Sequence, residues 1–422
     1  MAVVMSGTAI AQLISFALTP VISRFFNPSD FGIFGSFIAV LGVISAGVTL
    51  QYSQAVMLPK EDSDAANIFA VSIISVLFIT VIGIIEVCLF PVSLLSLFKA
   101  PDRYWLLWFF PFGIFLGGMN QSFQAWCIRR KAFAITSISQ VVRAISANIS
   151  QIGLGFFRAG GAGLAAGAVF GDGLANVNLT YLVFKKDWLQ IRQSVGWHKM
   201  KEMAYEYRDF PIYSSTQNVL NALSQGLPVL LLGHYYGVAI AGAYAFGVRI
   251  LSVPMSFVLV ALRQVLFQKA NETYNYGGKL YPLYLKITGG LFAISIIPSI
   301  ILFIWAPSIF AFIFGSKWFE AGIYARWLIL WLMVGFCNLP SNLFARILRQ
   351  QRNLFFYELV ILLSRVSVLI AGGILLSAKG TVILFSVVGC LLNVFFIFWI
   401  GCILRKNHVV IDTSKEKGIF QI

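Results

Sequence analysis

The chain carries about twelve apolar stretches of about twenty residues each, separated by short polar or Gly/Pro-containing breaks. An α-helix of about 20 residues crosses the hydrocarbon core of a bilayer, which is about 30 Å thick. The connections between these stretches are short, so we expect no soluble catalytic domain between them. The expected spanning helices are residues 2–22, 31–53, 67–90, 106–127, 135–156, 161–184, 211–233, 240–266, 287–306, 323–345, 354–376 and 380–404.

The composition also indicates a membrane-embedded chain. Hydrophobic residues make up 59% of the sequence and charged residues only 11%, whereas a soluble domain has about 25% charged residues. The apolar runs show no strict alternation, which the strands of a membrane barrel would need. We therefore expect an all-α integral membrane protein with about twelve transmembrane helices.

The basic residues are distributed unevenly between the loops. With the N-terminus in the cytoplasm, the inner loops hold about twenty Lys and Arg residues and the outer loops about six. The positive-inside rule then predicts that both termini are cytoplasmic. The net charge of +15 reflects this topology, so we expect no nucleic-acid partner. The five cysteines lack the spacing of a disulfide or zinc site, and we expect no metal and no cofactor.

A long polar segment divides the chain nearly in half, with six apolar stretches on each side. The sequence around Gly32 has a counterpart around Gly242, 210 residues later, which indicates an internal repeat of the kind found in secondary transporters. The expected organisation is an N-terminal lobe at 1–184, a cytoplasmic amphipathic linker at 185–210, a C-terminal lobe at 211–404 and a cytoplasmic tail at 405–422.

Three arginines, Arg143, Arg249 and Arg365, lie deep within predicted spans. A charge near the bilayer centre costs at least about 2.5–3.5 kcal/mol, so each one needs a physical reason. Guanidinium groups bind phosphate oxygens well, which predicts a cationic, water-filled cavity that receives an anion. The structural alternative is that Arg143 pairs with Asp172 and only holds the helix bundle together. Asp172 and Glu86 are the candidates for ion coupling.

Uncharged polar residues recur at helical spacing within several spans. Stripes of this kind would line a hydrophilic path between the helices. Interhelical hydrogen bonding is the alternative, at about 0.6 kcal/mol per bond on average. The candidate lining residues are Gln140, Asn176, Asn218, Asn221 and Gln225.

Several short motifs lie in the first seventy residues: Ser6–Ala9, Thr19–Arg24, Asn27–Gly32 and Ala55–Lys60. With them the chain resembles the polysaccharide transporter family, the Wzx-type flippases of the multidrug/oligosaccharidyl-lipid/polysaccharide (MOP) exporter superfamily. The resemblance implies a MATE-like fold of two six-helix lobes around a cationic cavity.

The same resemblance implies a transport function and no enzymatic one. Such a protein moves an undecaprenyl-diphosphate-linked oligosaccharide to the periplasmic leaflet of a bacterial inner membrane, for O-antigen of lipopolysaccharide or another surface polysaccharide. The implied partners are the lipid-linked oligosaccharide, membrane lipid, and the polysaccharide polymerase and chain-length regulator.

Two alternative functions fit the sequence less well. An ion-coupled small-molecule exporter of the multidrug type would favour buried acids over buried bases, because most of its substrates are cations. A membrane-embedded polymerase or glycosyltransferase would need a large outer loop or a soluble domain, and the outer loops here are short.

Overall fold

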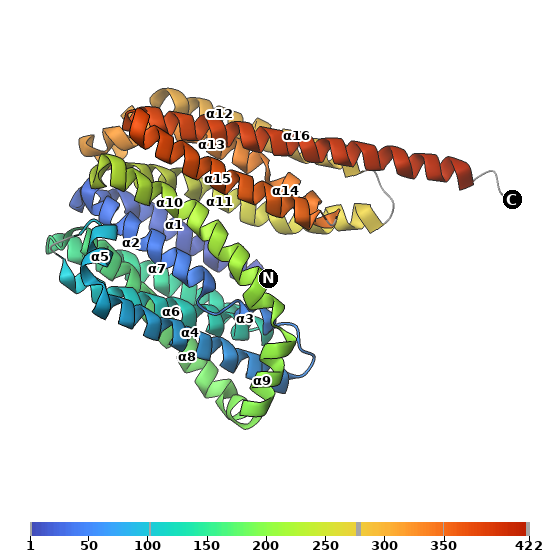
Figure 1. Cartoon of the computed structure of the whole chain (residues 1–422), viewed down its shortest axis with the longest axis horizontal. Helices are drawn as coiled ribbons and strands as arrows, with labels where there is room; N and C mark the ends of the chain where they lie inside the picture. Colours follow the sequence, from blue (N-terminus) through green and yellow to red (C-terminus); the bar gives the residue numbers. More distant parts are fainter. Residues whose placement is uncertain (1, 101–102, 276–279, 349, 419–422) are drawn as a thin grey trace. The chain divides into compact units, whose positions relative to one another are not determined.

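The computed structural model describes residues 2–100, 103–275, 280–348 and 350–418, and within them it contains helices and connections but no strand (Figure 1). Every expected apolar stretch is helical over most of its length. The prediction of an all-α membrane fold is therefore confirmed, and the differences concern where helices end and where they break.

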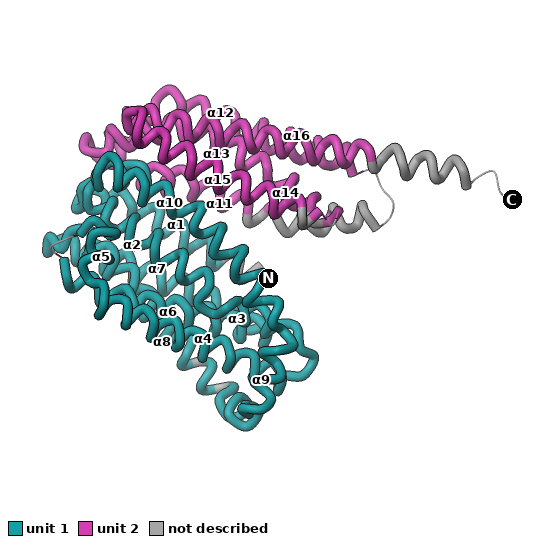
Figure 2. Tube along the Cα trace, in the orientation of Figure 1, with its two compact units in different colours: residues 1–245 teal, residues 246–422 magenta. Residues whose placement is uncertain are grey.

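The chain forms two compact units, residues 1–245 and 246–422, coloured separately in Figure 2. Unit 1 contains α1 (Ala2–Phe25), α2 (Pro28–Gly47), α3 (Tyr52–Ala55), α4 (Asp62–Leu89), α5 (Pro91–Leu97), α6 (Tyr104–Arg129), α7 (Phe133–Phe156), α8 (Gly160–Ser194), α9 (Trp197–Glu206), a π-helical turn (Phe210–Ser215), α10 (Thr216–Tyr236) and the start of α11 (Val238–Asn275).

Unit 2 contains the rest of α11 and the helices that follow it. These are α12 (Leu280–Phe314), a 3₁₀ turn (Ser316–Trp318), α13 (Phe319–Cys337), α14 (Leu339–Ile347), α15 (Gln351–Leu375) and α16 (Ala378–Gly418). Helix α10 packs against α2 and so groups with unit 1. The lobe boundaries expected from the sequence stay predictions, and residues 419–422 of the expected tail lie outside the described residues.

Eight helices in the described part of the chain are long and apolar enough to cross a membrane. Four more, α6, α7, α8 and α10, are 26, 24, 35 and 21 residues long but are not in this apolar set. At about 1.5 Å rise per residue each of them can also span a bilayer. The four helices have the length of spans but a more polar composition.

Local chemistry explains where two helices begin and break. Helix α2 starts with Pro28, and the Asp30 carboxylate accepts a 2.8 Å hydrogen bond from the N–H of Asn27, which satisfies a donor at the helix start. The expected helix 323–345 is divided between α13 and α14 at Asn338. Pro340 has no N–H to donate, so the helical hydrogen bonding cannot continue unbroken there.

Two other helix ends differ from the expectation. The expected helix 31–53 stops at Gly47, because Leu50 and Gln51 adopt left-handed φ angles of 48° and 59°. The expected helix 161–184 continues to Ser194. Lys185, Lys186 and Arg192 end the apolar stretch, but they are good helix formers and do not end the helix.

Aromatic clusters pack the interior of each unit. In unit 1, Phe37, Phe98 and Phe110 meet with ring centroids 5.4–6.2 Å apart. In unit 2, Tyr357 stacks on Phe396 at 3.9 Å. The outward faces of helices such as α4 and α12 carry exposed Leu, Ile and Phe residues. These faces are suited to contact with lipid, since a bilayer imposes no cost on exposed apolar groups.

Candidate functional site

The polar residues expected inside the membrane gather on the less apolar helices of unit 1. Helix α7 carries Gln140 and Arg143, α8 carries Asp172 and Asn176, and α10 carries Asn218, Asn221 and Gln225. None of these three helices is among the eight in the described part of the chain that are long and apolar enough to cross a membrane. The helices that carry most of the candidate site residues are therefore less apolar than the eight candidate spans.

Arg143 and Asp172 form an ion pair between α7 and α8, from the arginine Nε to the carboxylate Oδ1. The two helices can approach closely because Gly171 has no side chain. A Cβ at this position would lie 2.8 Å from the carbonyl oxygen of Arg143. The side chain of Asp172 is 10% exposed, but that of Arg143 is 55% exposed. The structural alternative predicted this ion pair, and the arginine nevertheless keeps more than half of its surface open.

Gln140 and Asn176 are used in contacts between helices. The hydroxyl of Thr8 on α1 donates to Oε1 of Gln140. The Nδ2 of Asn176 donates to the backbone carbonyl of Leu116 on α6 at 2.6 Å. These contacts match the interhelical alternative, and a cavity-lining role for the two residues stays a prediction.

The polar residues of α10 are more open. Asn221 and Gln225 are exposed, and Gln225 donates a 2.6 Å hydrogen bond to Asn221 one turn away. Asn218 on the same helix is half-buried. An exposed amide pair within a span can exchange its partner for a ligand hydroxyl, because each amide keeps further donors and acceptors.

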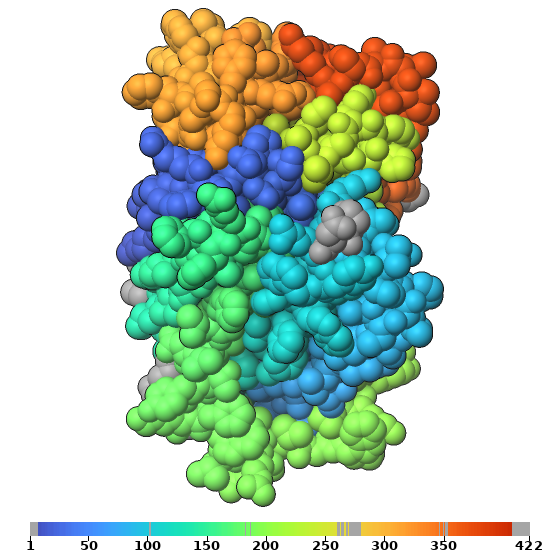
Figure 3. All heavy atoms as spheres, turned by 90° about the vertical axis from the view of Figure 1, so that its left-hand side faces the viewer, coloured from blue at the N-terminus to red at the C-terminus, as the bar shows by residue number. Residues whose placement is uncertain are grey.

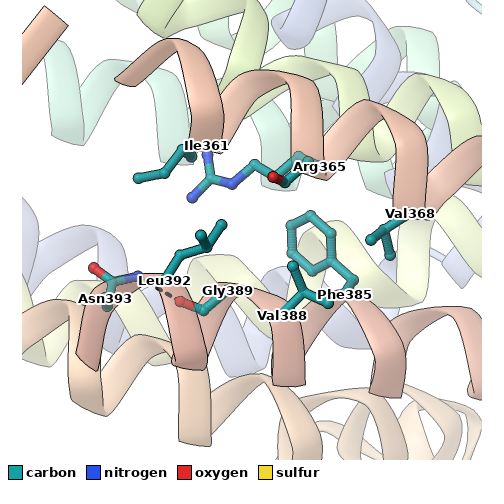
Figure 4. Close-up of a pocket in the computed structure, with 9 residues that line it drawn as sticks. Ile361, Arg365, Val368, Phe385, Val388, Gly389, Leu392 and Asn393 are labelled. Atoms are coloured by element: carbon teal, nitrogen blue, oxygen red, sulfur yellow. Dashed lines mark hydrogen bonds between the residues drawn. The ribbon is translucent and has the colours of Figure 1, made fainter. Parts of the chain in front are cut away.

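Arg365 lies in unit 2 and lines a pocket between α15 and α16 (Figure 4). Its guanidinium stands 5.0 Å from the ring of Trp331 and 5.9 Å from that of Phe385, which are cation–π distances. The cavity volume is about 10 Å³. That is room for about one water molecule, so this pocket is too small to hold an oligosaccharide.

Arg249 and Glu86 take no part in an ion pair with any described residue. Arg249 is partly exposed on α11 in unit 2, and Glu86 is half-buried near the end of α4 in unit 1. Among the candidate residues, the structure therefore pairs Arg143 with Asp172 by an ion pair and Asn221 with Gln225 by a hydrogen bond. The three arginines are distributed over both units.

The groups around Arg365 could not be identified from the sequence. Trp331 comes from α13 and Phe385 from α16, and Asn393 of the same pocket accepts a 2.8 Å hydrogen bond from Asn338 at the α13–α14 break. A single-helix periodicity cannot detect residues on three different helices. Pro340 marks the break between α13 and α14 in the sequence, but it does not identify these groups.

Comparison with known proteins places the chain in a family. The family described as polysaccharide biosynthesis protein matches residues 21–323. No curated protein sequence matches the chain. Because the family match covers well over half of the chain, it establishes family membership.

The solved structures that resemble the chain are transporters. An inward-facing multidrug resistance MATE family transporter of the MOP superfamily has 15% identity over 96% of this chain and 99% of that chain, with a TM-score of 0.76. An outward-facing multidrug resistance MATE family transporter of the MOP superfamily has 14% identity over 97% of this chain and 96% of that chain, with a TM-score of 0.60. A Vibrio cholerae MATE transporter has 14% identity over 96% of both chains, with a TM-score of 0.56.

At these identities the structures establish the fold and not the substrate. The family match confirms the family resemblance noted from the first seventy residues, and the solved structures confirm the expected fold. The chain is a multi-pass membrane protein that belongs to the polysaccharide biosynthesis protein family and has the transporter fold of the MOP superfamily.

Proposed function

We propose that the protein is a flippase for an undecaprenyl-diphosphate-linked oligosaccharide. It moves the lipid-linked unit from the cytoplasmic to the periplasmic leaflet of a bacterial inner membrane, for O-antigen or another surface polysaccharide. Both termini are cytoplasmic in this proposal, and the polymerase and chain-length regulator act on the product. The polysaccharide family and the transporter fold support this assignment over an enzymatic one.

The exposure of Arg143 is the observation that carries the proposal. Arg143 is 10 residues from the start of α7 and 13 from its end, so it lies about 15–20 Å from either end. Its side chain is 55% exposed. A guanidinium exposed to hydrocarbon at that depth is unfavourable, whereas one facing a water-filled cavity is tolerated. This argues for an aqueous, cationic surface on α7.

The proposed substrate offers two kinds of group to such a surface. The candidates for neutralising its diphosphate are Arg143, Arg249 and Arg365, since arginine binds phosphate through several donors. Its sugar hydroxyls would bond to amides such as Asn221 and Gln225. The polyprenyl tail would stay in lipid while the polar groups are exposed to each side in turn.

An ion gradient is the proposed driving force, with Asp172 or Glu86 as the group that binds the ion. Asp172 is the stronger candidate, because its partner Arg143 is also a proposed substrate contact and links the two events. If collapse of the gradient stops wild-type transport while Asp172→Asn transports normally, the role of Asp172 is refuted.

The second candidate function is ion-coupled export of small molecules, which the MATE structures favour. The balance of charge argues against it. Arg143, Arg249 and Arg365 outnumber the acids Asp172 and Glu86 inside the spans, and a site for cationic drugs would have the opposite balance.

Complementation tests the proposal. A bacterium without its own flippase would receive wild type, Arg143→Ala, Arg249→Ala or Arg365→Ala at matched expression, with Arg158→Ala in an exposed connection as the control. We expect surface glycan with wild type and the control. The three arginine variants should leave the lipid-linked intermediate on the cytoplasmic leaflet. Normal transport by all three variants would refute the cationic site.

A further inference from the structure

The end of α8 and the helix α9 form a surface rich in exposed aromatic and basic residues. We call residues 181–208 the elbow. In Figure 3 its green atoms lie on the surface of unit 1, at the bottom of the view. The elbow belongs entirely to unit 1 and contains none of the residues proposed for transport.

One stripe of α8 leads to the elbow. Phe170, Leu174, Val177, Tyr181, Phe184 and Trp188 recur at intervals of three and four residues, and all six are exposed, by 41–66%. Residues at this spacing share one helix face. From Phe170 to Trp188 the helix rises about 27 Å, so the stripe runs from the middle of the expected span 161–184 to just beyond its end. The stripe is therefore suited to contact with lipid, and we infer that Trp188 reaches the level of the headgroups.

Basic side chains lie beside the last residues of this stripe. Lys185 stands 5.6 Å from the ring of Tyr181, and Arg192 is exposed. The neighbouring acid is directed inward, since Asp187 is 9% exposed, accepts a 3.0 Å hydrogen bond from Trp126 and pairs with Arg130 at 3.1 Å. The pairing removes a negative charge from the elbow surface.

Helix α9 is held in one orientation on the bundle. Met200 and Met203 are buried, the hydroxyl of Tyr52 donates to the carbonyl of Ala204 at 3.0 Å, and Lys199 pairs with Asp64 on α4 at 3.6 Å. The hydrogen bond to Glu202 and the attraction of Asp64 raise the pKa of Lys199, so it is charged at neutral pH.

The opposite face of α9 alternates aromatic and basic residues. Trp197 and Tyr205 are 66% and 69% exposed. Lys201 lies 5.2 Å from the ring of Trp197, and the guanidinium of Arg208 lies 4.4 Å from that of Tyr205. The four positions are three or four residues apart, so they form a continuous row. Indole and phenol rings prefer the membrane interface, and each Lys or Arg near an anionic surface adds attraction.

From these observations we propose that the elbow binds anionic phospholipid headgroups of the leaflet at this end of unit 1. Continuity with the lipid-contacting stripe of α8 favours a lipid over an acidic protein segment. The exposed basic residues of the elbow, Lys185, Arg192, Lys201 and Arg208, outnumber its exposed acids, Glu202 and Glu206. This excess of positive charge favours negative headgroups over zwitterionic ones. The expected placement of basic loops in the cytoplasm makes this the inner leaflet.

Quenching of Trp197 fluorescence tests the proposal. The full chain would be placed in phosphatidylcholine nanodiscs that contain an equal fraction of brominated phosphatidylglycerol or brominated phosphatidylcholine. The contribution of Trp197 is the difference from Trp197→Phe, a change at an exposed position. We expect stronger quenching by the brominated phosphatidylglycerol. Lys201→Gln with Arg208→Gln should lower this preference about thirtyfold, given about 1 kcal/mol for each of the two basic residues.

The control removes the same charge elsewhere at the same end of unit 1. Lys60→Gln with Lys131→Gln changes two exposed lysines, and the preference should remain. Equal quenching of Trp197 by both lipids would overturn the selectivity for anionic headgroups. No quenching by either lipid would overturn membrane contact and indicate an acidic protein as the occupant. Equal loss in the control would show that net charge acts without the elbow.

Discussion

Gly32 on α2 and Gly242 on α11 meet backbone to backbone within unit 1. A Cβ on Gly32 would lie 1.9 Å from the carbonyl oxygen of Val238, and a Cβ on Gly242 would lie 1.8 Å from that of Pro28. The contacts are reciprocal, since each contact residue and each glycine has its counterpart 210 residues away. This reciprocity is what a two-fold relation between the starts of α2 and α11 produces, and it supports the internal repeat predicted from the sequence.

Alanine at either glycine should be destabilising. Gly32→Ala or Gly242→Ala inserts a methyl group against backbone that cannot rotate away, and overpacking of this kind costs about 1–3 kcal/mol. Gly42→Ala is the control, because nothing lies within 4 Å of its Cβ position on the same helix α2. Thermal unfolding in detergent should show a lower midpoint for the first two variants and an equal or higher one for the control. An unchanged midpoint in Gly242→Ala would refute the close contact.

Substitutions at Arg143 and Asp172 can distinguish a structural role of Arg143 from a role in transport. Arg143→Gln leaves the buried Asp172 carboxylate without its arginine, at an expected cost of about 1–3 kcal/mol. Adding Asp172→Asn should restore most of the stability, because two amides can bond to each other. Thermal unfolding and transport would be measured for both. We expect stability to recover while transport stays lost, and recovery of both would make Arg143 structural.

Asn67 holds the turn between α8 and α9 with two hydrogen bonds. Its Nδ2 donates to the carbonyl of Ser194 at 2.8 Å, and its Oδ1 accepts from the N–H of Gly196 at 3.0 Å. Asn67→Ala should speed hydrogen exchange of the Gly196 amide by about tenfold, which corresponds to about 1.4 kcal/mol. Ser75→Ala on the same helix α4 removes a hydroxyl that bonds to the Val71 carbonyl. Exchange at Gly196 should not respond to that control.

Arg129 supports the connection between α3 and α4. Its Nη1 donates to the carbonyls of Val56 and Pro59, both at 2.9 Å, and its Nη2 pairs with Asp62 at 2.9 Å. A lysine ammonium cannot span these acceptors as a planar guanidinium does. Arg129→Lys should therefore increase tryptic cleavage after Lys60 several-fold.

Arg130→Lys is the matched control for that experiment. Arg130 also pairs with Asp62, at 2.8 Å, but it has no hydrogen bond to the carbonyls of the connection within the described residues. Its side chain is 35% exposed, against 10% for Arg129. The cleavage rate should stay near that of wild type, and an equal increase in both variants would assign the effect to Asp62 alone.

The sequence alone determined the helices of this protein. Hydropathy and length are local properties of each segment, and a bilayer requires about 20 apolar residues per span, so every expected stretch is helical over most of its length. Hydropathy reports the end of an apolar stretch and not the end of a helix. For this reason α8 runs ten residues past the predicted end, to Ser194.

Only the tertiary structure decided which polar residues are open and which are used between helices. On a helical wheel Gln140 and Arg143 belong to the same stripe of α7. Packing gives Gln140 a partner on α1, 132 residues away, whereas Arg143 remains 55% exposed. Likewise Asn176 bonds to α6 while Asn221 stays exposed on α10. Partners of this kind come from distant segments, and only the packing of whole helices sets the rotation that brings them together.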